Sequence, residues 1–310
     1  MTSRKEFLRQ GLIGTGLLAT AQFPWQSLAS TTAQEKLLIL HTNDVHSHLE
    51  PFPSDGGKYA GQGGLAARAS LIKKLRSENE HVLLFDSGDI FQGTPYFNMY
   101  KGEPEIKAMS LLKYDAGTMG NHDFDAGVEG FAQQLPHANF PMLCSNYDFT
   151  GTALEGKTQP YTIIKKGEIK VGVFGLGIRL KGLVSDKDFE GTTYLDPIRM
   201  ANKTANILKR KGCHLIICLS HLGYSYSSRK VSDLVLAKET ENIDLILGGH
   251  THTFLDRPEQ LKNKKGQEVV VNQVGWAGLR LGQIHYEFGH KKNVNLSKSV
   301  SVILDKETIG

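Results

Sequence analysis

Histidine, aspartate and asparagine gather in five short polar segments of this chain. The side chains concerned are those of Asp44, His46, Asp89, Asn121, His122, Asp123, Asp125, His221, His250 and His252. Imidazole, carboxylate and amide groups without thiolates suit Zn, Mn, Fe or Co better than Ca or Mg. The set is too large for one tetrahedral ion, so it predicts two divalent ions. With Asp44, Asp89 and a bridging hydroxide, the centre keeps a charge of about +1, which attracts a phosphate dianion and activates water.

Each polar segment follows a short apolar run. The runs predicted to be strands are Leu37–Leu40, Val82–Phe85, Lys170–Gly175, Leu215–Leu219 and Asp244–Leu247, with a weaker strand near Ala116. Short runs rich in leucine or β-branched residues, bounded by glycine or polar residues, are typical of buried strands. One such segment alone is more often a solvated turn. Because the carboxyl ends of parallel strands share one edge of a sheet, the segments together predict one pocket there.

Amphipathic stretches alternate with these strands. The predicted helices are Leu65–Ser77, Pro104–Leu112, Gly127–Gln134, Pro197–Lys211 and Arg229–Glu239. Asp196 precedes Pro197 as a helix N-cap, and Lys165–Glu168 predicts a hairpin turn. From Glu268 onward the sequence is rich in strand-like runs. This mixture predicts a single α/β domain over residues 34–310, with sheets covered by helices.

The first 33 residues have the composition of an export signal. The charged segment SRKEFLR (Ser3–Arg9) is followed by an apolar stretch, Gly11–Phe23, and by small residues near Ala29–Ala33. SRKEFLR resembles the twin-arginine motif, with Lys5 in place of the second arginine, so the ordinary secretory route stays open. We expect a bacterial protein exported to the periplasm or secreted, without stable membrane insertion. An uncleaved anchor is the alternative.

Charge and cysteine content narrow the function classes. The 310 residues carry a formal net charge of +4, and removal of the signal would leave +2. So small an excess does not favour binding to a nucleic-acid polymer. Three cysteines are too few for a disulfide scaffold. Cys213 and Cys218 flank a predicted strand, where either packing or a disulfide is possible.

The motifs HTNDVHSH, GDIFQG, GNHDFD, SHLGY and GGHTHT occur in the order and context found in calcineurin-like metallophosphoesterases. The chain most closely resembles their 5′-nucleotidase and UDP-sugar hydrolase branch, over nearly its whole length after the signal. The resemblance implies a four-layer α-β-β-α sandwich of mixed sheets with helices on the outer faces.

The resemblance also implies a role for each site residue. Asp44, His46 and His252 would bind the first metal, and Asn121, His221 and His250 the second, with Asp89 bridging both. His122 would contact the phosphate together with Asn121, and Asp125 would orient His122. Some members of the branch have glutamine at the position of His252, so metal preference is expected to differ here. The implied reaction is in-line attack of a metal-bridging hydroxide on a phosphate monoester, most readily a nucleoside 5′-monophosphate.

Full-length members of the branch carry a C-terminal domain that stacks the nucleobase. We expect that domain to be absent from this chain, or supplied by a separate chain. Phe91, Tyr96, Phe97 and Tyr100 are candidate base-stacking residues, although core packing explains them equally well. The alternatives within the fold are a 2′,3′-cyclic phosphodiesterase, a nucleotide-sugar hydrolase and a thiosulfohydrolase-like enzyme that attacks sulfur. An idle subunit that only binds a ligand is the alternative outside catalysis.

Overall fold

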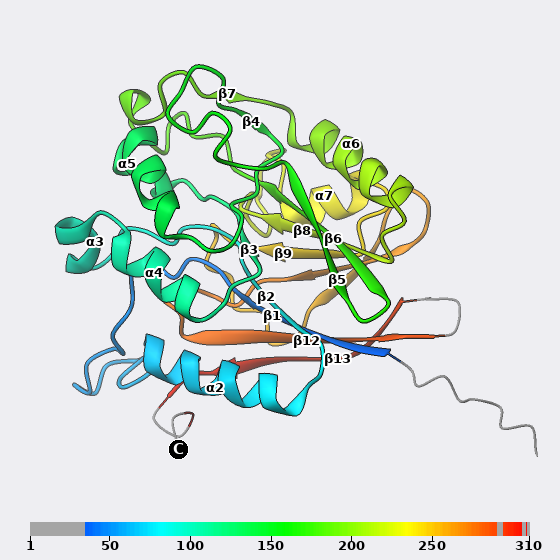
Figure 1. Ribbon diagram of the computed structural model, residues 1–310, viewed down its shortest axis with the longest axis horizontal. Helices are drawn as coiled ribbons and strands as arrows, with labels where there is room; N and C mark the ends of the chain where they lie inside the picture. Colours follow the sequence, from blue (N-terminus) through cyan, green and yellow to red (C-terminus); the bar gives the residue numbers. More distant parts are fainter. Residues whose placement is uncertain (1–34, 290–293, 306–307, 309–310) are drawn as a thin grey trace, which may run out of the picture. The chain divides into compact units, whose positions relative to one another are not determined.

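Two β-sheets form the centre of the molecule (Figure 1). The computed structural model describes residues 35–289, 294–305 and 308, so the predicted export signal lies outside the described residues. The first sheet has the strand order β13-β12-β1-β2-β3. Its strands are β1 (Glu35–Thr42), β2 (Val82–Asp86), β3 (Ala116–Gly117), β12 (Arg280–Phe288) and β13 (Val294–Ile303). β1, β2 and β3 run parallel, and β12 and β13 are antiparallel additions.

The second sheet has the strand order β10-β11-β9-β8-β6-β5. Its strands are β5 (Tyr161–Lys166), β6 (Ile169–Leu176), β8 (Leu215–Ser220), β9 (Leu245–Gly248), β10 (Glu259–Lys262) and β11 (Glu268–Asn272). The four inner strands are parallel, and β5 and β10 are antiparallel edges. A small separate pair joins β4 (Tyr147–Asp148) to β7 (Thr193–Tyr194). The hairpin predicted at Lys165–Glu168 is confirmed between β5 and β6.

The helices lie on the outer faces of the two sheets (Figure 1). They are α2 (Leu65–Glu78), α3 (Pro95–Tyr100), α4 (Glu103–Leu111), α5 (Gly127–Gln134), α6 (Pro197–Arg210) and α7 (Asp233–Glu239). Short 3₁₀ turns occur at His122–Phe124, Leu135–His137 and Asp186–Phe189. The predicted cap of α6 is confirmed, because the Asp196 side chain accepts a hydrogen bond of 2.7 Å from the Arg199 N–H.

Three apolar clusters separate the layers. In β1, Leu37 and Ile39 face the second sheet, and Leu38 and Leu40 face the helices on the other side. This follows from the two-residue period of a strand. A third cluster joins the outer face of the second sheet to α6 and α7. The layers therefore run helix, sheet, sheet, helix, and the predicted four-layer α/β sandwich is confirmed.

Two details differ from the sequence predictions. The helix expected to begin at Arg229 begins at Asp233, because the Ser232 side chain caps it by accepting from the Val235 N–H. The segment after Thr94, where no helix was predicted, contains α3, which has a proline at its start.

Cys144, Cys213 and Cys218 are free and buried, so the possible disulfide is not formed.

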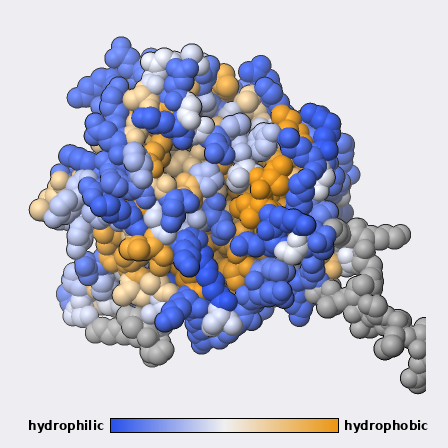
Figure 2. All heavy atoms as spheres, viewed as in Figure 1, coloured by the Kyte–Doolittle hydropathy of each residue, from blue (hydrophilic) through white to orange (hydrophobic). Residues whose placement is uncertain are grey.

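The visible face of the molecule is largely hydrophilic, with hydrophobic residues in a few smaller areas (Figure 2). No helix among the described residues has the length and apolar character needed to cross a membrane.

The cluster between the sheets should carry much of the stability. Leu83 lies in it and is 0% exposed, whereas Leu111 on α4 is 81% exposed. We predict that Leu83→Ala lowers the free energy of unfolding by about 3 kcal/mol, since it removes buried methyl groups and leaves a cavity. Leu111→Ala, the matched control, should change it by less than about 0.5 kcal/mol. Urea denaturation of both variants measures the difference, and equal values would contradict this account of the core.

Candidate metal centre

Loops at the carboxyl ends of parallel strands meet where the two sheets adjoin. The seven expected ligands, with the strand each follows, are Asp44 and His46 after β1, Asp89 after β2, Asn121 after β3, His221 after β8, and His250 and His252 after β9. Ser87 links the sheets, since its hydroxyl donates to the Leu247 carbonyl (2.8 Å) and its own carbonyl lies 2.7 Å from His221 Nδ1. The predicted convergence of distant segments is therefore what the structure shows, but the segments come from the strand ends of two sheets and not from one sheet edge.

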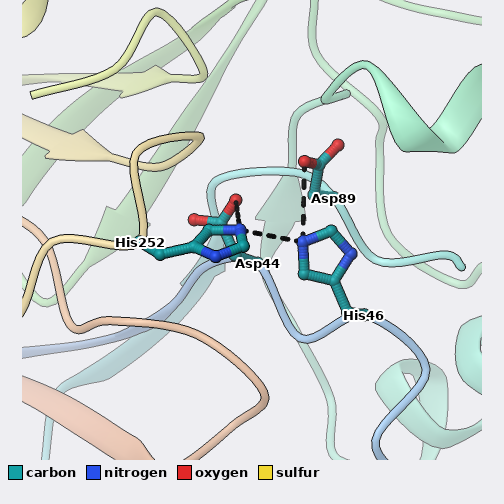
Figure 3. Close-up of side chains that lie close together, drawn as sticks. All are labelled: Asp44, His46, Asp89 and His252. Carbon is teal, nitrogen blue, oxygen red and sulfur yellow. Dashed lines mark hydrogen bonds and ion pairs between the residues drawn. The ribbon is translucent and has the colours of Figure 1, made fainter. Parts of the chain in front are cut away.

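The first group of side chains comprises Asp44, His46, Asp89 and His252, whose possible ligand atoms all lie within 4.8 Å of one another (Figure 3). His46 Nε2 is 3.0 Å from His252 Nε2 and 3.8 Å from Asp89 Oδ2. His252 Nε2 is 3.5 Å from Asp44 Oδ1. Two imidazole nitrogens and two carboxylates thus point at one small volume, as a divalent cation requires.

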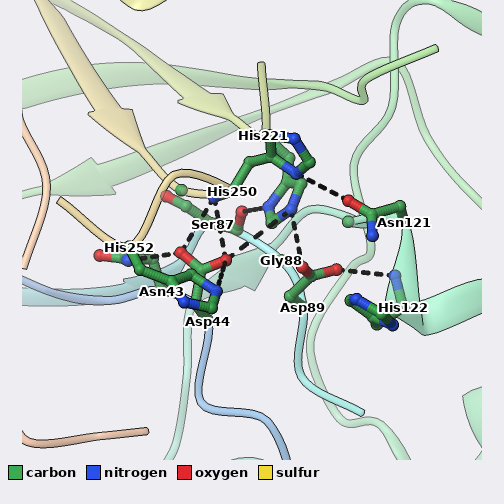
Figure 4. Close-up of polar contacts among 12 residues, drawn as sticks. Asn43, Asp44, Ser87, Gly88, Asp89, Asn121, His122, His221, His250 and His252 are labelled. Atoms are coloured by element: carbon green, nitrogen blue, oxygen red, sulfur yellow. Dashed lines mark hydrogen bonds and ion pairs between the residues drawn. The ribbon is translucent and has the colours of Figure 1, made fainter. Parts of the chain in front are cut away.

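The second group comprises Asp89, His221 and His250, again within 4.8 Å (Figure 4). His221 Nε2 is fully buried and lies 3.1 Å from Asp89 Oδ2. Asn121 Oδ1 lies 2.8 Å from His250 Nδ1, which adds an amide oxygen to the group. Imidazole nitrogens, a carboxylate and an amide oxygen meet here, and this donor set suits a divalent cation, so the residues present fit a second ion. Asp89 belongs to both groups, as a bridging ligand must.

The surroundings shift the pKa values of the two carboxylates, Asp44 and Asp89, in opposite directions. Burial raises the pKa of Asp44 well above its usual range. Burial also acts to raise the pKa of Asp89, but the charge and close approach of His221 outweigh it and hold that pKa well below its usual range. Asp89 is therefore ionised even before a cation binds, whereas Asp44 gains most from the added positive charge.

Three of the four histidines expected to bind metal have lowered pKa values, so these three rings are neutral at pH 7. Burial lowers the pKa of His46, lowers that of His250 to about 3 and lowers that of His252 to about 4. Burial acts in the same direction on His221, but Asp89 and Asp44 raise its pKa to about 10. A cation and this proton compete for the same nitrogen, so metal binding at His221 would release a proton.

The backbone of the site is strained. Five of the expected ligands are non-glycine residues in the left-handed region, with φ between 50° and 72°: Asp44, His46, Asp89, His250 and His252. Such conformations cost about 1 kcal/mol or more each and persist where the surroundings enforce them. They occur in the short loops that directly follow β1, β2 and β9.

Asp123 is a supporting residue to which the sequence analysis gave no role. Its carboxylate accepts four backbone N–H groups, from Asp89 (3.0 Å), Ile90 (2.9 Å), Phe91 (3.1 Å) and Gly120 (2.8 Å). It thereby ties the loop after β2 to the loop after β3. The position of this aspartate next to His122 in the motif GNHD was the only sequence feature that pointed to it. Residue type alone does not distinguish an aspartate that binds main-chain N–H groups from one that binds a metal.

Asn43 is a second supporting residue that the sequence did not reveal. Its amide donates to Asp44 Oδ2 (2.7 Å) and to the Gly275 carbonyl (2.6 Å), and its oxygen accepts from the Val274 N–H (3.0 Å). It therefore holds the carboxylate of Asp44 against the segment that follows β11.

His122 and Asp125 form a separate pair beside the two groups. His122 Nδ1 lies 2.8 Å from Asp125 Oδ2, and the His122 N–H donates to Asp89 Oδ1 (2.8 Å). The hydrogen bond to Asp125 raises the pKa of His122 above its usual 6.5, against the opposing effect of burial. The side chain of His122 is 36% exposed, so its Nε2 is accessible to a ligand.

Other polar residues near the site have structural roles. His41 is buried and contacts Asn272, 2.8 Å away, which agrees with packing rather than ligation. Asp86 accepts from the Thr42 hydroxyl and from the Gly88 N–H, so it caps the turn before Asp89.

Among the candidate base-stacking residues, Phe91 and Phe97 belong to the core, at 0% and 4% exposed. Tyr100 is 49% exposed and Tyr96 is half-buried, with its hydroxyl donating to Glu50. Core packing is therefore the correct interpretation for two of the four.

Sequence comparison decides the family. The model of the calcineurin-like phosphoesterase family matches residues 37–254, which is more than half of the chain and contains both groups. The chain belongs to this family.

Similar proteins include several 5′-nucleotidases. Snake venom 5′-nucleotidase from Crotalus adamanteus is 35% identical over 311 residues, covering 94% of this chain and 52% of that protein. The structure of the 5′-nucleotidase precursor from Thermus thermophilus has a TM-score of 0.81 at 32% identity, covering 88% of this chain and 55% of that one. YfkN from Bacillus subtilis has a TM-score of 0.72 at 29% identity, covering 89% and 95%. The phosphoesterase chain spans about half the length of the 5′-nucleotidases it matches.

Gly120 tests the packing of the centre. A Cβ added at this residue would meet Asp89 Oδ1 at 2.1 Å and the Asp89 backbone nitrogen at 2.5 Å. We predict that Gly120→Ala displaces Asp89 and weakens metal binding about 10-fold to 100-fold, as loss of ligand support does. Gly289→Ala is the matched control, because its Cβ would meet no atom within 4 Å. Metal content after dialysis gives the comparison, and an unchanged content in Gly120→Ala would refute the steric argument.

The pair of His122 and Asp125 predicts a pH effect. Because the hydrogen bond from Asp125 raises the pKa of His122, Asp125→Asn should lower it, so that His122 loses its proton at a lower pH than in the parent protein. NMR titration of the His122 ring in chelator-treated protein measures both midpoints. Asp55→Asn removes an exposed carboxylate elsewhere and should leave the midpoint in place. The interpretation fails if Asp125→Asn leaves it in place as well.

Proposed function

We propose that this phosphoesterase hydrolyses phosphate monoesters, and nucleoside 5′-monophosphates in particular, with two divalent cations. The observation that supports this most directly is the place of Asp89 in both ligand groups, which is the arrangement a two-metal centre needs. The 5′-nucleotidases among its relatives support the substrate class. The nitrogen and oxygen ligand set suits Mn, Zn, Fe or Co.

Each side chain has a defined task in this proposal. Asp44, His46 and His252 would hold the first cation, Asn121, His221 and His250 would hold the second, and Asp89 would serve both. Bound cations supply a nucleophile from water at neutral pH and positive charge for the phosphate. Asn121 and the accessible Nε2 of His122 face the phosphate oxygens, where charge increases in the transition state.

His122 is the catalytic residue of the chain itself. Asp125 accepts a hydrogen bond from the His122 Nδ1–H, which fixes the ring and favours the protonated imidazolium. The Nε2–H of that ring then stabilises the phosphate or gives its proton to the departing oxygen. No covalent bond between enzyme and phosphate is required.

We also propose that residues 1–33 direct export. Support comes from the sequence: a charged start, a short apolar stretch and small residues near Ala29–Ala33. N-terminal sequencing of the protein recovered from the periplasm or the medium gives the test. An intact N-terminus in the cytoplasmic fraction would contradict it.

Phosphate release by the purified protein tests the function. With AMP as substrate and Mn, Zn or Co added in turn, we expect release that a chelator abolishes. His122→Ala should lower kcat by about 10²-fold to 10⁴-fold and keep bound metal. Asp89→Ala should lose metal and activity together. His137→Ala, at a half-buried histidine away from the centre, is the control and should leave both unchanged.

Each outcome separates a role from its alternative. Near-parental kcat in His122→Ala would remove that residue from catalysis. A metal-replete Asp89→Ala protein would contradict the shared ligand. No release of phosphate from AMP or from an aryl phosphate with any of the metals would reject the proposed reaction.

A further inference from the structure

A group of aromatic rings lies beside the first ligand group and outside the hydrophobic core. We call it the aromatic shelf, and its members are His48, Phe52, Tyr59, Phe254 and Trp276. All five are half-buried, and none belongs to the three apolar clusters. Large rings that are left partly exposed in contact with each other, next to a reaction centre, are typical of a binding surface.

The shelf begins at a proposed metal ligand. The ring of Trp276 lies parallel to that of His252, with 5.7 Å between centroids and 5° between planes. Around Trp276 stand His48, Phe52 and Tyr59, with their ring planes steeply inclined to the indole, at 5.6, 5.9 and 6.4 Å. The aromatic surface therefore begins directly beside His252. A substrate whose phosphate lies at the metals can reach this surface with the rest of the molecule.

The shelf ends at a pocket. Tyr59 and Phe254 stack with 6.4 Å between centroids, and both line a hollow of about 340 Å³. Two cations border the same hollow: Lys58 Nζ lies 5.0 Å from the Tyr59 ring, and the Arg280 guanidinium lies 4.9 Å from the Phe254 ring. This volume is in the range of sites for small organic ligands.

Two polar groups on the shelf are available to a ligand. Among the described residues, neither the Trp276 indole N–H nor the Tyr59 hydroxyl has a hydrogen-bond partner. The core tyrosines behave differently, since the Tyr147 hydroxyl donates to the Ile178 carbonyl and that of Tyr114 pairs with Thr42. The shelf thus combines flat apolar surface with free hydrogen-bond donors. A heterocyclic base can stack on such a surface and accept hydrogen bonds from such donors.

We propose that the aromatic shelf binds the base of a nucleoside phosphate and so selects esters that carry a flat heterocycle. This inference rests on the proposed function for the phosphate, but base binding itself does not require turnover. It assigns base recognition to this chain and to residues other than those of the segment Phe91–Tyr100, where the phenylalanines are buried.

A direct binding test uses fluorescence. The sequence contains two tryptophans, Trp25 and Trp276, so Trp25→Phe leaves Trp276 as the reporter. In metal-loaded protein of this background, adenosine should change Trp276 emission saturably. Glycerol, which has hydroxyl groups but no base, should not. Tyr59→Leu and Phe52→Leu should each weaken adenosine binding about tenfold, within the range of base stacking on aromatic side chains.

Kinetics give the second measurement. Tyr59→Leu should lower kcat/KM for AMP about tenfold and leave that for glycerol 3-phosphate unchanged. Tyr161→Leu is the matched control, because Tyr161 is a half-buried tyrosine on β5, packed in the cluster around α6 and α7. Circular dichroism verifies folding, and Phe52→Leu replaces Tyr59→Leu if the latter is unfolded.

The outcomes separate this inference from the proposed function. Hydrolysis of AMP without any adenosine response overturns the shelf and leaves the phosphatase intact. An adenosine response without hydrolysis of any ester supports the shelf and rejects the phosphatase. Equal loss for AMP and glycerol 3-phosphate in Tyr59→Leu also overturns the shelf, because it indicates a structural effect on the centre.

Discussion

The site depends on one carboxylate, that of Asp89. Its Oδ1 accepts the His122 N–H, and its Oδ2 lies close to both His221 and His46. Its backbone is held by Asp123, which also binds the loop after β3. Loops from three strands are thus ordered around a single side chain. If Asp89 moves, both groups of ligands change at once.

The two sheets hold the buried carboxylates of Asp44 and Asp89 close together, away from solvent. Asp44 and Asp89 are almost fully buried, and an unpaired buried charge is strongly unfavourable. Neighbouring imidazoles and backbone N–H groups offset part of the penalty, and bound cations would offset much of the rest. Rigid strands on both sides keep these groups in place, because each ligand lies within a few residues of a strand end.

Much of the fold was readable from the sequence because its signals are local. The run LLIL predicts a buried strand by composition, and Asp196-Pro197 predicts a helix start by capping chemistry. The candidate ligands were readable because each follows such a run. The start of α7 was not, since Arg229 and its neighbours are compatible with a helix and only the Ser232 cap decides where it begins.

Features that depend on distant contacts were not readable. Phe91 and Phe97 have the same residue type as ligand-stacking rings, and only the tertiary structure shows that they pack in the core. The contact between Trp276 and His252 joins two loops that precede and follow β10 and β11. The four main-chain bonds of Asp123 likewise depend on how two loops are folded against each other.

The left-handed backbone of five ligands has an evolutionary consequence. At such φ angles glycine is the least strained residue, so replacing Asp44 or His250 with glycine would relax the loop while it removed the ligand. If these side chains bind metal, they do so at positions where glycine would fit the backbone with less strain. A descendant that did not need a metal site would gain stability from glycine at these positions. Glycine substitutions in these turns would then appear before substitutions in the hydrophobic core.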